Sequence, residues 1–218
     1  MRIINTLFIT TLLFLSINAH SSEADKISKY FQSREFQKQL FELGVYWDRN
    51  ILNIQTDCKS QYHLLPVSYS FIKPLKFETD SIHPSEGIFT FRYEFKRCNE
   101  IITYNALVSA QAGKGVKLSA LVPGTTRVSP QLLKDLYIGG VSGMVATKRK
   151  NQECQKTTVT DTKVTLDPTA TMSGKNNTNG MWEEFWTVKH CAETIEMSFC
   201  FIPDANGGTS WSSGKCVK

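Results

Sequence analysis

The residues of this chain whose types could support chemistry are histidines, cysteines and one pair of adjacent glutamates. Outside the N-terminal segment the histidines are His63, His83 and His190, so a histidine-dependent reaction would have to use one of these. Glu183 and Glu184 are neighbours on a predicted strand, where successive side chains point to opposite faces, so they do not form a paired-carboxylate site. The sequence contains no GxSxG, HExxH, P-loop or Rossmann glycine pattern. We therefore predict no catalytic, cofactor-binding or metal-binding residues.

The six cysteines point to disulfides instead of a metal site. Zinc sites need CxxC-type spacing or paired histidines, and the histidines here are scattered. An even number of cysteines in an exported chain is typical of a disulfide framework, although six cysteines allow about 15 pairings. The choice among these pairings needs evidence beyond cysteine spacing.

Residues 1–22 are typical of a secretory signal peptide. Arg2 supplies a positive charge, residues 7–15 an apolar core and residues 17–19 a small-residue cleavage site. The apolar run is shorter than the roughly 20 residues that a spanning helix needs. Without Arg2 the mature chain has 24 Lys and Arg against 20 Asp and Glu, a net charge of +4. We expect a protein secreted through the periplasm, with no transmembrane segment in the mature chain.

An internal repeat organises the mature chain. Residues 87–106 (GIFTFRYEFKRCNEIITYNA) align without a gap with residues 180–199 (GMWEEFWTVKHCAETIEMSF), and residues 33–58 align in the same way with residues 129–154. Each pair of windows places a cysteine at the same position. Two matches in the same order indicate a tandem duplication. We place the first repeat at residues 23–126, the second at residues 127–218, and the boundary at the Pro-Gly-Thr-Thr sequence of residues 123–126.

The pattern of each repeat predicts one amphipathic helix followed by about four antiparallel strands. Apolar residues recur every three to five positions in residues 22–47, and Ser22 and Ser33 are predicted N-caps. In the second repeat Ser129 and Pro130 predict a helix start. Glycines 139, 140 and 143 then allow this helix to lie close to a sheet or to its twin, whereas Gly44 favours fraying or an end of the first helix. The predicted class is α+β, with each helix packed on its own antiparallel sheet and each unit held by disulfides. The sequence leaves open whether the two sheets are separate or form one continuous sheet.

The basic run of residues 148–150 closes the second predicted helix, where cations complement the helix dipole. No aromatic interleaving or known module accompanies this run, so we expect no nucleic-acid partner.

The repeat also chooses among the disulfide pairings. Equivalent cysteines should pair equivalently, which predicts Cys58 with Cys98 and Cys154 with Cys191. Cys200 and Cys216 remain and flank the last predicted hairpin. They form the third predicted disulfide.

Two positions break the pattern of the repeated strand. Phe91 is inward and Arg92 outward in the first copy, whereas Glu184 and Phe185 occupy these positions in the second. A buried lone carboxylate is costly and needs a partner. Either a bulge or repacking re-aims the strand, or Glu184 faces a polar cleft and Phe185 an interface. The predicted partner-binding residues are Trp182, Glu184, Phe185, Trp186 and Trp211, with core packing as the ordinary alternative for Trp182 and Trp186.

Several motifs resemble a pattern seen in uncharacterised exported proteins of Gram-negative bacteria. They are the Trp182-x-Glu184-x-Trp186-Thr187-Val188-x-x-Cys191 run, Phe201-x-Pro203-Asp204, Gly207-Gly208-Thr209, Arg92-Tyr93-x-x-x-Arg97-Cys98, Tyr104-Asn105-Ala106 and Pro123-Gly124-Thr125-Thr126. Asn99 and Ala192 stand where such proteins often have glycine. The resemblance implies a type II secretion substrate of an intracellular pathogen, and it provides no activity to carry over to this chain.

The sequence therefore favours a secreted, non-enzymatic protein that binds a protein or glycan partner on a host or cell surface. One alternative is an exported hydrolase with a dispersed site that combines histidine and a carboxylate. Another is a periplasmic factor for envelope assembly.

Overall fold

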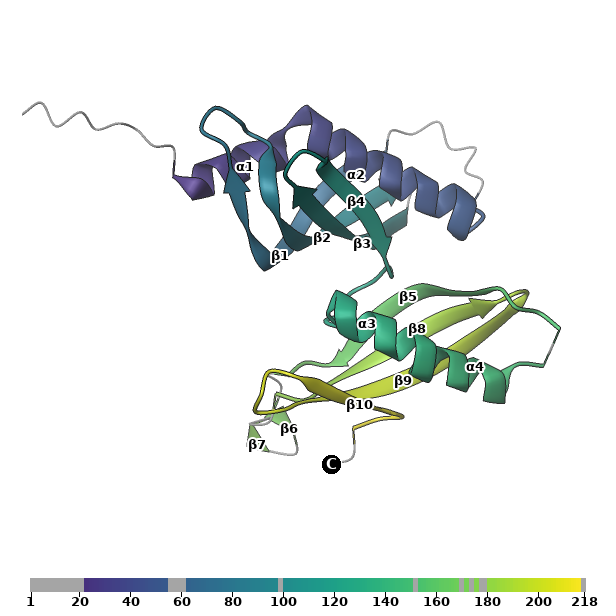
Figure 1. The fold of residues 1–218 in the computed structure, drawn as a ribbon. Coiled ribbons are helices and arrows are strands. Elements are labelled where there is room, and N and C mark those ends of the chain that lie inside the picture. The colour runs from purple at the N-terminus through teal and green to yellow at the C-terminus, as the bar shows by residue number, and fades with distance from the viewer. Residues whose placement is uncertain are drawn as a thin grey trace, which may run out of the picture.

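The computed structural model describes residues 22–54, 62–97, 100–150, 153–168, 171–172, 175–176 and 180–216. These residues form two helix-plus-sheet units in tandem, as the repeat predicts (Figure 1). The two four-stranded sheets are separate, and in each unit the helical segment lies across one face of its own sheet. The predicted α+β class with a duplicated architecture is confirmed.

The two units have matching element orders. The first contains α1 (Glu23–Gln32), α2 (Arg34–Tyr46), the π-helical turn η1 (Trp47–Ile51), β1 (His63–Phe77), β2 (Pro84–Arg97), β3 (Glu100–Gln111) and β4 (Gly115–Leu121). The second contains α3 (Pro130–Leu136), the π-helical turn η2 (Tyr137–Val141), α4 (Ser142–Lys148), β5 (Thr157–Leu166), β8 (Trp182–His190), β9 (Glu193–Pro203) and β10 (Thr209–Ser213). A short pair, β6 (Thr171–Met172) and β7 (Lys175–Asn176), lies between β5 and β8. Both sheets are antiparallel meanders, ordered β1-β2-β3-β4 and β5-β8-β9-β10.

The helices begin where the sequence predicts. Ser22 accepts a hydrogen bond from the backbone of Asp25 in a capping box, and Ser33 caps α2 through its side-chain oxygen. Ser129 caps α3, with Pro130 at the first helical position. These local signals set the entry of each helix onto its sheet.

Glycines let both helices approach their sheets closely, which the sequence predicts for the second helix but not for Gly44. Of the three glycines named for the second helix, Gly143 takes no part, because a Cβ added there would meet no atom within 4 Å. A Cβ atom at Gly44 would lie 3.0 Å from the Phe95 ring, and one at Gly140 would lie 3.0 Å from Phe199 and 3.1 Å from Trp211. Gly44 does not end its helix, because α2 continues to Tyr46 and then into η1. Packing against the sheet outweighs the helix cost of glycine, about 1 kcal/mol relative to alanine.

Each unit has its own core beneath its helix. In β2 the inward side chains are aromatic and buried, as the strand parity predicts: Phe89, Phe91, Tyr93 and Phe95. In the second unit the core is built mainly from β8, β9 and the α3–α4 segment. The helix-free face of each sheet carries the alternate, more polar side chains.

Two of the three predicted disulfides are present. Cys154 bonds Cys191 and Cys200 bonds Cys216, with Cα–Cα distances of 6.3 and 4.9 Å. The predicted pair of Cys58 with Cys98 lies outside the described residues. In the loop-entropy model, each closed loop of this size stabilises the fold by about 3–4 kcal/mol.

Candidate functional site

The segment between the units, residues 122–129, is hydrogen-bonded to both sheets. On one side the Gly124 amide donates to the Thr103 carbonyl of β3 at 2.8 Å. On the other side the Thr125 amide donates to the Thr162 carbonyl of β5 at 2.6 Å. The connection is therefore a structured junction, with backbone pairing to each unit, and not a loose tether.

Asn105 of β3 anchors the junction from the first unit. Its side chain is buried, and its Nδ2 donates to the carbonyls of Val122 and Gly124 at 2.8 and 2.9 Å. Its Oδ1 accepts from Arg92 Nε at 2.8 Å. The side-chain amide thus uses both donor hydrogens and its acceptor, which fixes the orientation of the guanidinium.

Arg92 extends from β2 across this amide to the junction. Its Nη2 donates to the Thr126 carbonyl. Burial lowers the pKa of Arg92, the nearby Arg127 lowers it further, and Glu184 of the second unit opposes these effects. The guanidinium is therefore held in a partly buried position under the electrostatic influence of the second unit.

Glu184 anchors the junction from the second unit and is fully buried. Its Oε1 accepts hydrogen bonds from the Arg127 amide at 2.7 Å and from Trp182 Nε1 at 2.9 Å. Its Oε2 accepts from Trp186 Nε1 at 2.8 Å. A buried carboxylate needs hydrogen-bond donors in place of the water molecules it has lost, and these three donors provide them.

One peptide group connects these two anchors. The Thr126 carbonyl accepts from Arg92, and the Arg127 amide of the same peptide bond donates to Glu184. Arg92 and Glu184 are two of the residues at which the copies of the repeated strand differ. Two of the departures from the repeat are therefore among the contacts that join the units through the junction.

This arrangement excludes a bulge in β8 as the explanation of Glu184. The pairing of β8 with β9 runs unbroken from Trp182 to His190, so no bulge re-aims β8. A register shift does lie opposite Glu184, but it is on the β5 side between Val164 and Leu166. Glu184 keeps its inward direction, and its partners are two indole groups and the junction backbone.

A cleft of about 480 Å³ lies between the helix-free face of the first sheet and the junction. One wall comes from β1 and β2 and includes Ser68, Ser70, Thr90 and Arg92. The opposite wall comes from the junction and α3 and includes Thr126, Arg127, Ser129 and Leu133. The lining contains two arginines and no carboxylate. The cleft is thus a positively charged, hydroxyl-rich site between the two units.

The predicted partner-binding residues lie elsewhere in the second unit. Trp182 and Trp186 are buried beside Glu184, and Trp182 stacks on Phe201. Phe185 is half-buried on the outer face of β8, where it pairs with Lys163 and Ser198. Trp211 is half-buried beneath the α3–η2 segment and contacts the Phe199 ring. In this conformation a partner could reach only Phe185 and Trp211, and their role stays a prediction.

The three histidines lie apart from the cleft. His63 is exposed, and His83 Nε2 lies 3.5 Å from Glu35 Oε2 on the open surface. His190 is buried, with Nδ1 3.0 Å from the Thr157 hydroxyl. Among the described residues, His, Cys, Asp and Glu side chains form no group of three that could hold a metal ion.

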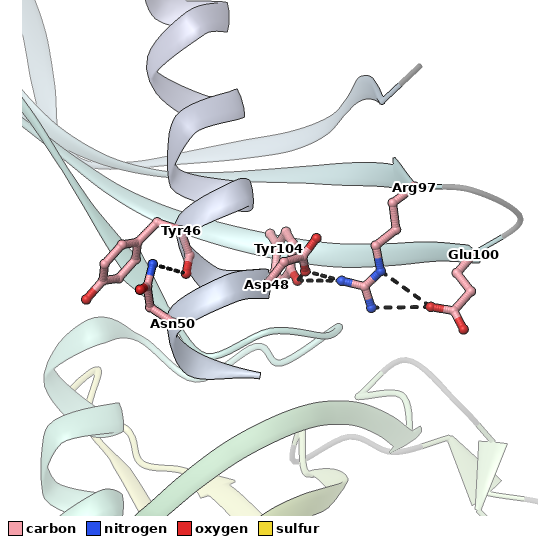
Figure 2. A network of polar contacts seen from close by, with 6 residues as sticks. All are labelled: Tyr46, Asp48, Asn50, Arg97, Glu100 and Tyr104. Carbon is pink, nitrogen blue, oxygen red and sulfur yellow. Dashed lines mark hydrogen bonds and ion pairs between the residues drawn. The ribbon is translucent and has the colours of Figure 1, made fainter. Parts of the chain in front are cut away.

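A buried charge network stabilises the first unit away from the cleft (Figure 2). Arg97 of β2 pairs with Asp48 of η1, and the Tyr104 hydroxyl also donates to this carboxylate. Glu100, which is mostly exposed, lies 3.3 Å from Arg97 Nη2. Burial lowers the pKa of Arg97, but the hydrogen bond and charge of Asp48 outweigh burial, so the net pKa shift is upward. This network fixes the end of the helix against β2 and β3.

Comparisons with known proteins give no assignment: no family model, no curated protein and no solved structure matches this chain. None of the helices in the described part of the chain is long and apolar enough to cross a bilayer.

The sequence contains one signal for the junction, which is the residue type at position 92. Arg92 stands opposite Phe185 in the repeat alignment, and that difference marks it as specific to the first copy. Asn105 lies in the Tyr104-Asn105-Ala106 motif and Thr126 in the Pro-Gly-Thr-Thr motif of residues 123–126, but neither residue type by itself indicates a binding site. Their roles depend on contacts between strands that are distant in sequence.

We expect Glu184→Gln to destabilise the protein by about 2–3 kcal/mol, because a carboxamide nitrogen cannot accept the hydrogen bond of an indole N–H. Urea unfolding followed by tryptophan fluorescence measures this effect. Glu196→Gln, at an exposed position on β9, is the matched control and should change stability by less than about 0.5 kcal/mol. Equal stabilities of the two variants would contradict the role assigned to Glu184.

Proposed function

We propose that this chain is an exported, non-enzymatic protein that binds a protein or glycan partner outside the cell, and that the cleft at the junction is its binding site. The observation that carries the proposal is the cleft itself, with its two arginines and its row of hydroxyl groups. Clefts of roughly 300–1,000 Å³ with a few fixed polar groups are the usual form of small-ligand sites. Two disulfides within the described residues support an exported protein.

The residues of the cleft are held in place before any ligand arrives. Arg92 is fixed by Asn105 and by the Thr126 carbonyl, and Ser68 and Ser70 are on a strand paired with β2. Sites built on strands with supported side chains hold their geometry better than sites on loops. The proposed route outward is type II secretion of a folded, oxidised periplasmic intermediate, with a host surface as the place of binding.

The test compares surface binding by two matched variants of the mature protein. Ser70→Trp places a large uncharged side chain at the β1 wall of the cleft, whereas Ser212→Trp makes the same change at an exposed position on β10. We expect fluorescently labelled wild type and Ser212→Trp to bind host cells with similar affinity, and Ser70→Trp to bind at least tenfold more weakly. Equal binding by the two variants would reject the cleft as the site.

Fractionation of the producing bacterium tests the location separately. We expect the protein in the culture supernatant. Retention of the whole pool in the periplasm would favour the envelope-assembly alternative over a secreted binding protein.

A further inference from the structure

The cleft has a charge pattern that selects among possible ligands. Arg92 and Arg127 both line it, and its lining includes no acidic side chain. Arg127 is about half exposed and pairs across the surface with Asp167 at 2.8 Å. Arg92 is more enclosed, and burial lowers its pKa, so placing this cation in the cleft has an electrostatic cost.

The hydrogen bonds of Arg92 leave its charge available to a ligand. Its Nε donates to the amide oxygen of Asn105, and its Nη2 donates to the backbone carbonyl of Thr126. Both acceptors are neutral, and Nη1 takes part in neither bond. These two bonds orient the guanidinium without neutralising it, although the buried carboxylate of Glu184 in the second unit offsets part of its charge. An arginine held in this way suits a carboxylate, which it can meet with charge-assisted hydrogen bonds.

The rest of the wall suits a ligand with many hydroxyl groups. Ser68 is paired with Arg92 across β1 and β2, and Ser70 is paired with Thr90, so these four side chains form a patch on the helix-free face. Hydroxyl groups both donate and accept hydrogen bonds, and they match the hydroxyls of a sugar. Ile72 and Leu133, also in the lining, provide apolar surface for the C–H faces of the ring.

A peptide added as a strand would bind in a different place. It would use the outer edge of β1, which is the terminal strand of its sheet, and not the face that the cleft covers. We infer that the cleft binds an acidic monosaccharide unit, with its carboxylate at Arg92 and its hydroxyls along Ser68, Ser70 and Thr90. This inference rests on the proposed binding function and names the class of ligand.

Ligand-observed NMR and calorimetry with defined sugars test this inference. The probes are glucuronate and N-acetylneuraminate as acidic sugars, glucose and N-acetylglucosamine as neutral sugars, acetate as a bare carboxylate, and an acidic dipeptide. We expect the mature protein to bind at least one acidic sugar at least tenfold more tightly than the neutral sugars, acetate and the dipeptide. This affinity should fall as salt concentration rises, because salt screens charge interactions.

Variants of both arginines connect the preference to the cleft. Arg92→Gln should lose at least tenfold in affinity for the acidic sugar, and Arg127→Gln, at the rim, should lose about threefold. Lys163→Gln removes an exposed positive charge from β5 and should leave binding unchanged. Because Arg92 also supports the junction, Thr90→Val provides a second cleft variant that keeps Arg92, and it should weaken sugar binding about threefold. Circular dichroism checks that each variant is folded.

Equal binding of acidic and neutral sugars would overturn the inference, as would binding of the dipeptide alone or affinity unchanged by both arginine variants. If no acidic sugar binds but cell-surface binding still depends on Ser70, the proposed function stands and only the ligand class is wrong.

Discussion

Asp48→Ala destabilises the first unit by about 3–5 kcal/mol, because it leaves the Arg97 guanidinium buried without its main counter-charge. Both side chains are almost fully buried, and the Tyr104 hydroxyl loses the same acceptor. Burial of an unpaired charge is among the largest costs that a single substitution can impose. Urea unfolding monitored by circular dichroism measures the change, with the disulfides kept oxidised.

Glu100→Ala provides a control on the same arginine. This carboxylate also pairs with Arg97, but its side chain is 70% exposed, and exposed ion pairs contribute about 0–1 kcal/mol. Asp48→Ala should therefore cost at least three times as much as Glu100→Ala. If the two units unfold in separate transitions, the loss of stability should appear in the transition of the first unit. Similar costs for the two variants would show that burial does not control the energy of this network.

Gly124→Ala is expected to destabilise the protein by about 3–5 kcal/mol, through strain and steric overlap together. Gly124 has φ +95°, a conformation that residues with a Cβ rarely adopt. A Cβ here would lie 2.0 Å from the Thr162 carbonyl oxygen and 2.4 Å from the Thr162 amide nitrogen. Neither backbone atom can move without breaking the pairing of the junction with β5. Differential scanning calorimetry of the mature protein measures the loss.

Gly113→Ala separates the strain from the overlap. Gly113, in the turn between β3 and β4, has φ +73°, and a Cβ added there would meet no atom within 4 Å. The Gly113→Ala substitution should therefore lower the free energy of unfolding by only about 1–2 kcal/mol, because only the left-handed backbone conformation opposes it. A Gly124→Ala variant no less stable than Gly113→Ala would show that the junction does not pack tightly on β5. Gly124→Ala should also weaken ligand binding, since the cleft uses the same segment as a wall.

These two regions give the protein different properties. The Asp48 network stabilises the first unit internally, whereas the junction fixes one unit relative to the other. The junction matters for function because one wall of the cleft comes from β1 and β2 and the other from residues 126–133. A loose connection between the units would change the width of the cleft and the position of Arg127 relative to Arg92. The hydrogen bonds of Asn105, Arg92 and Glu184 prevent this.

Local patterns in the sequence were enough to predict the architecture of each unit. Serines at the helix starts, glycines on the sheet-facing sides of the helices and alternation along the repeated strands all depend on residues close in sequence. The duplication then predicted the bonds of Cys154 with Cys191 and, by elimination, of Cys200 with Cys216. It also identified positions 184 and 185 as departures from the pattern, without assigning them partners.

Only the tertiary structure determined what those departures do. Arg92 reaches a residue 34 positions away, and Glu184 accepts from an amide 57 positions away. Asp48 and Arg97 are likewise 49 positions apart, and His190 replaces Arg97 in the second copy, so the repeat could not predict this pair. Side-chain contacts between separate strands depend on how the helices, sheets and junction pack together, and neither periodicity nor spacing encodes that packing. The amino-acid sequence by itself determined two similar units, and their packing determined the cleft between them.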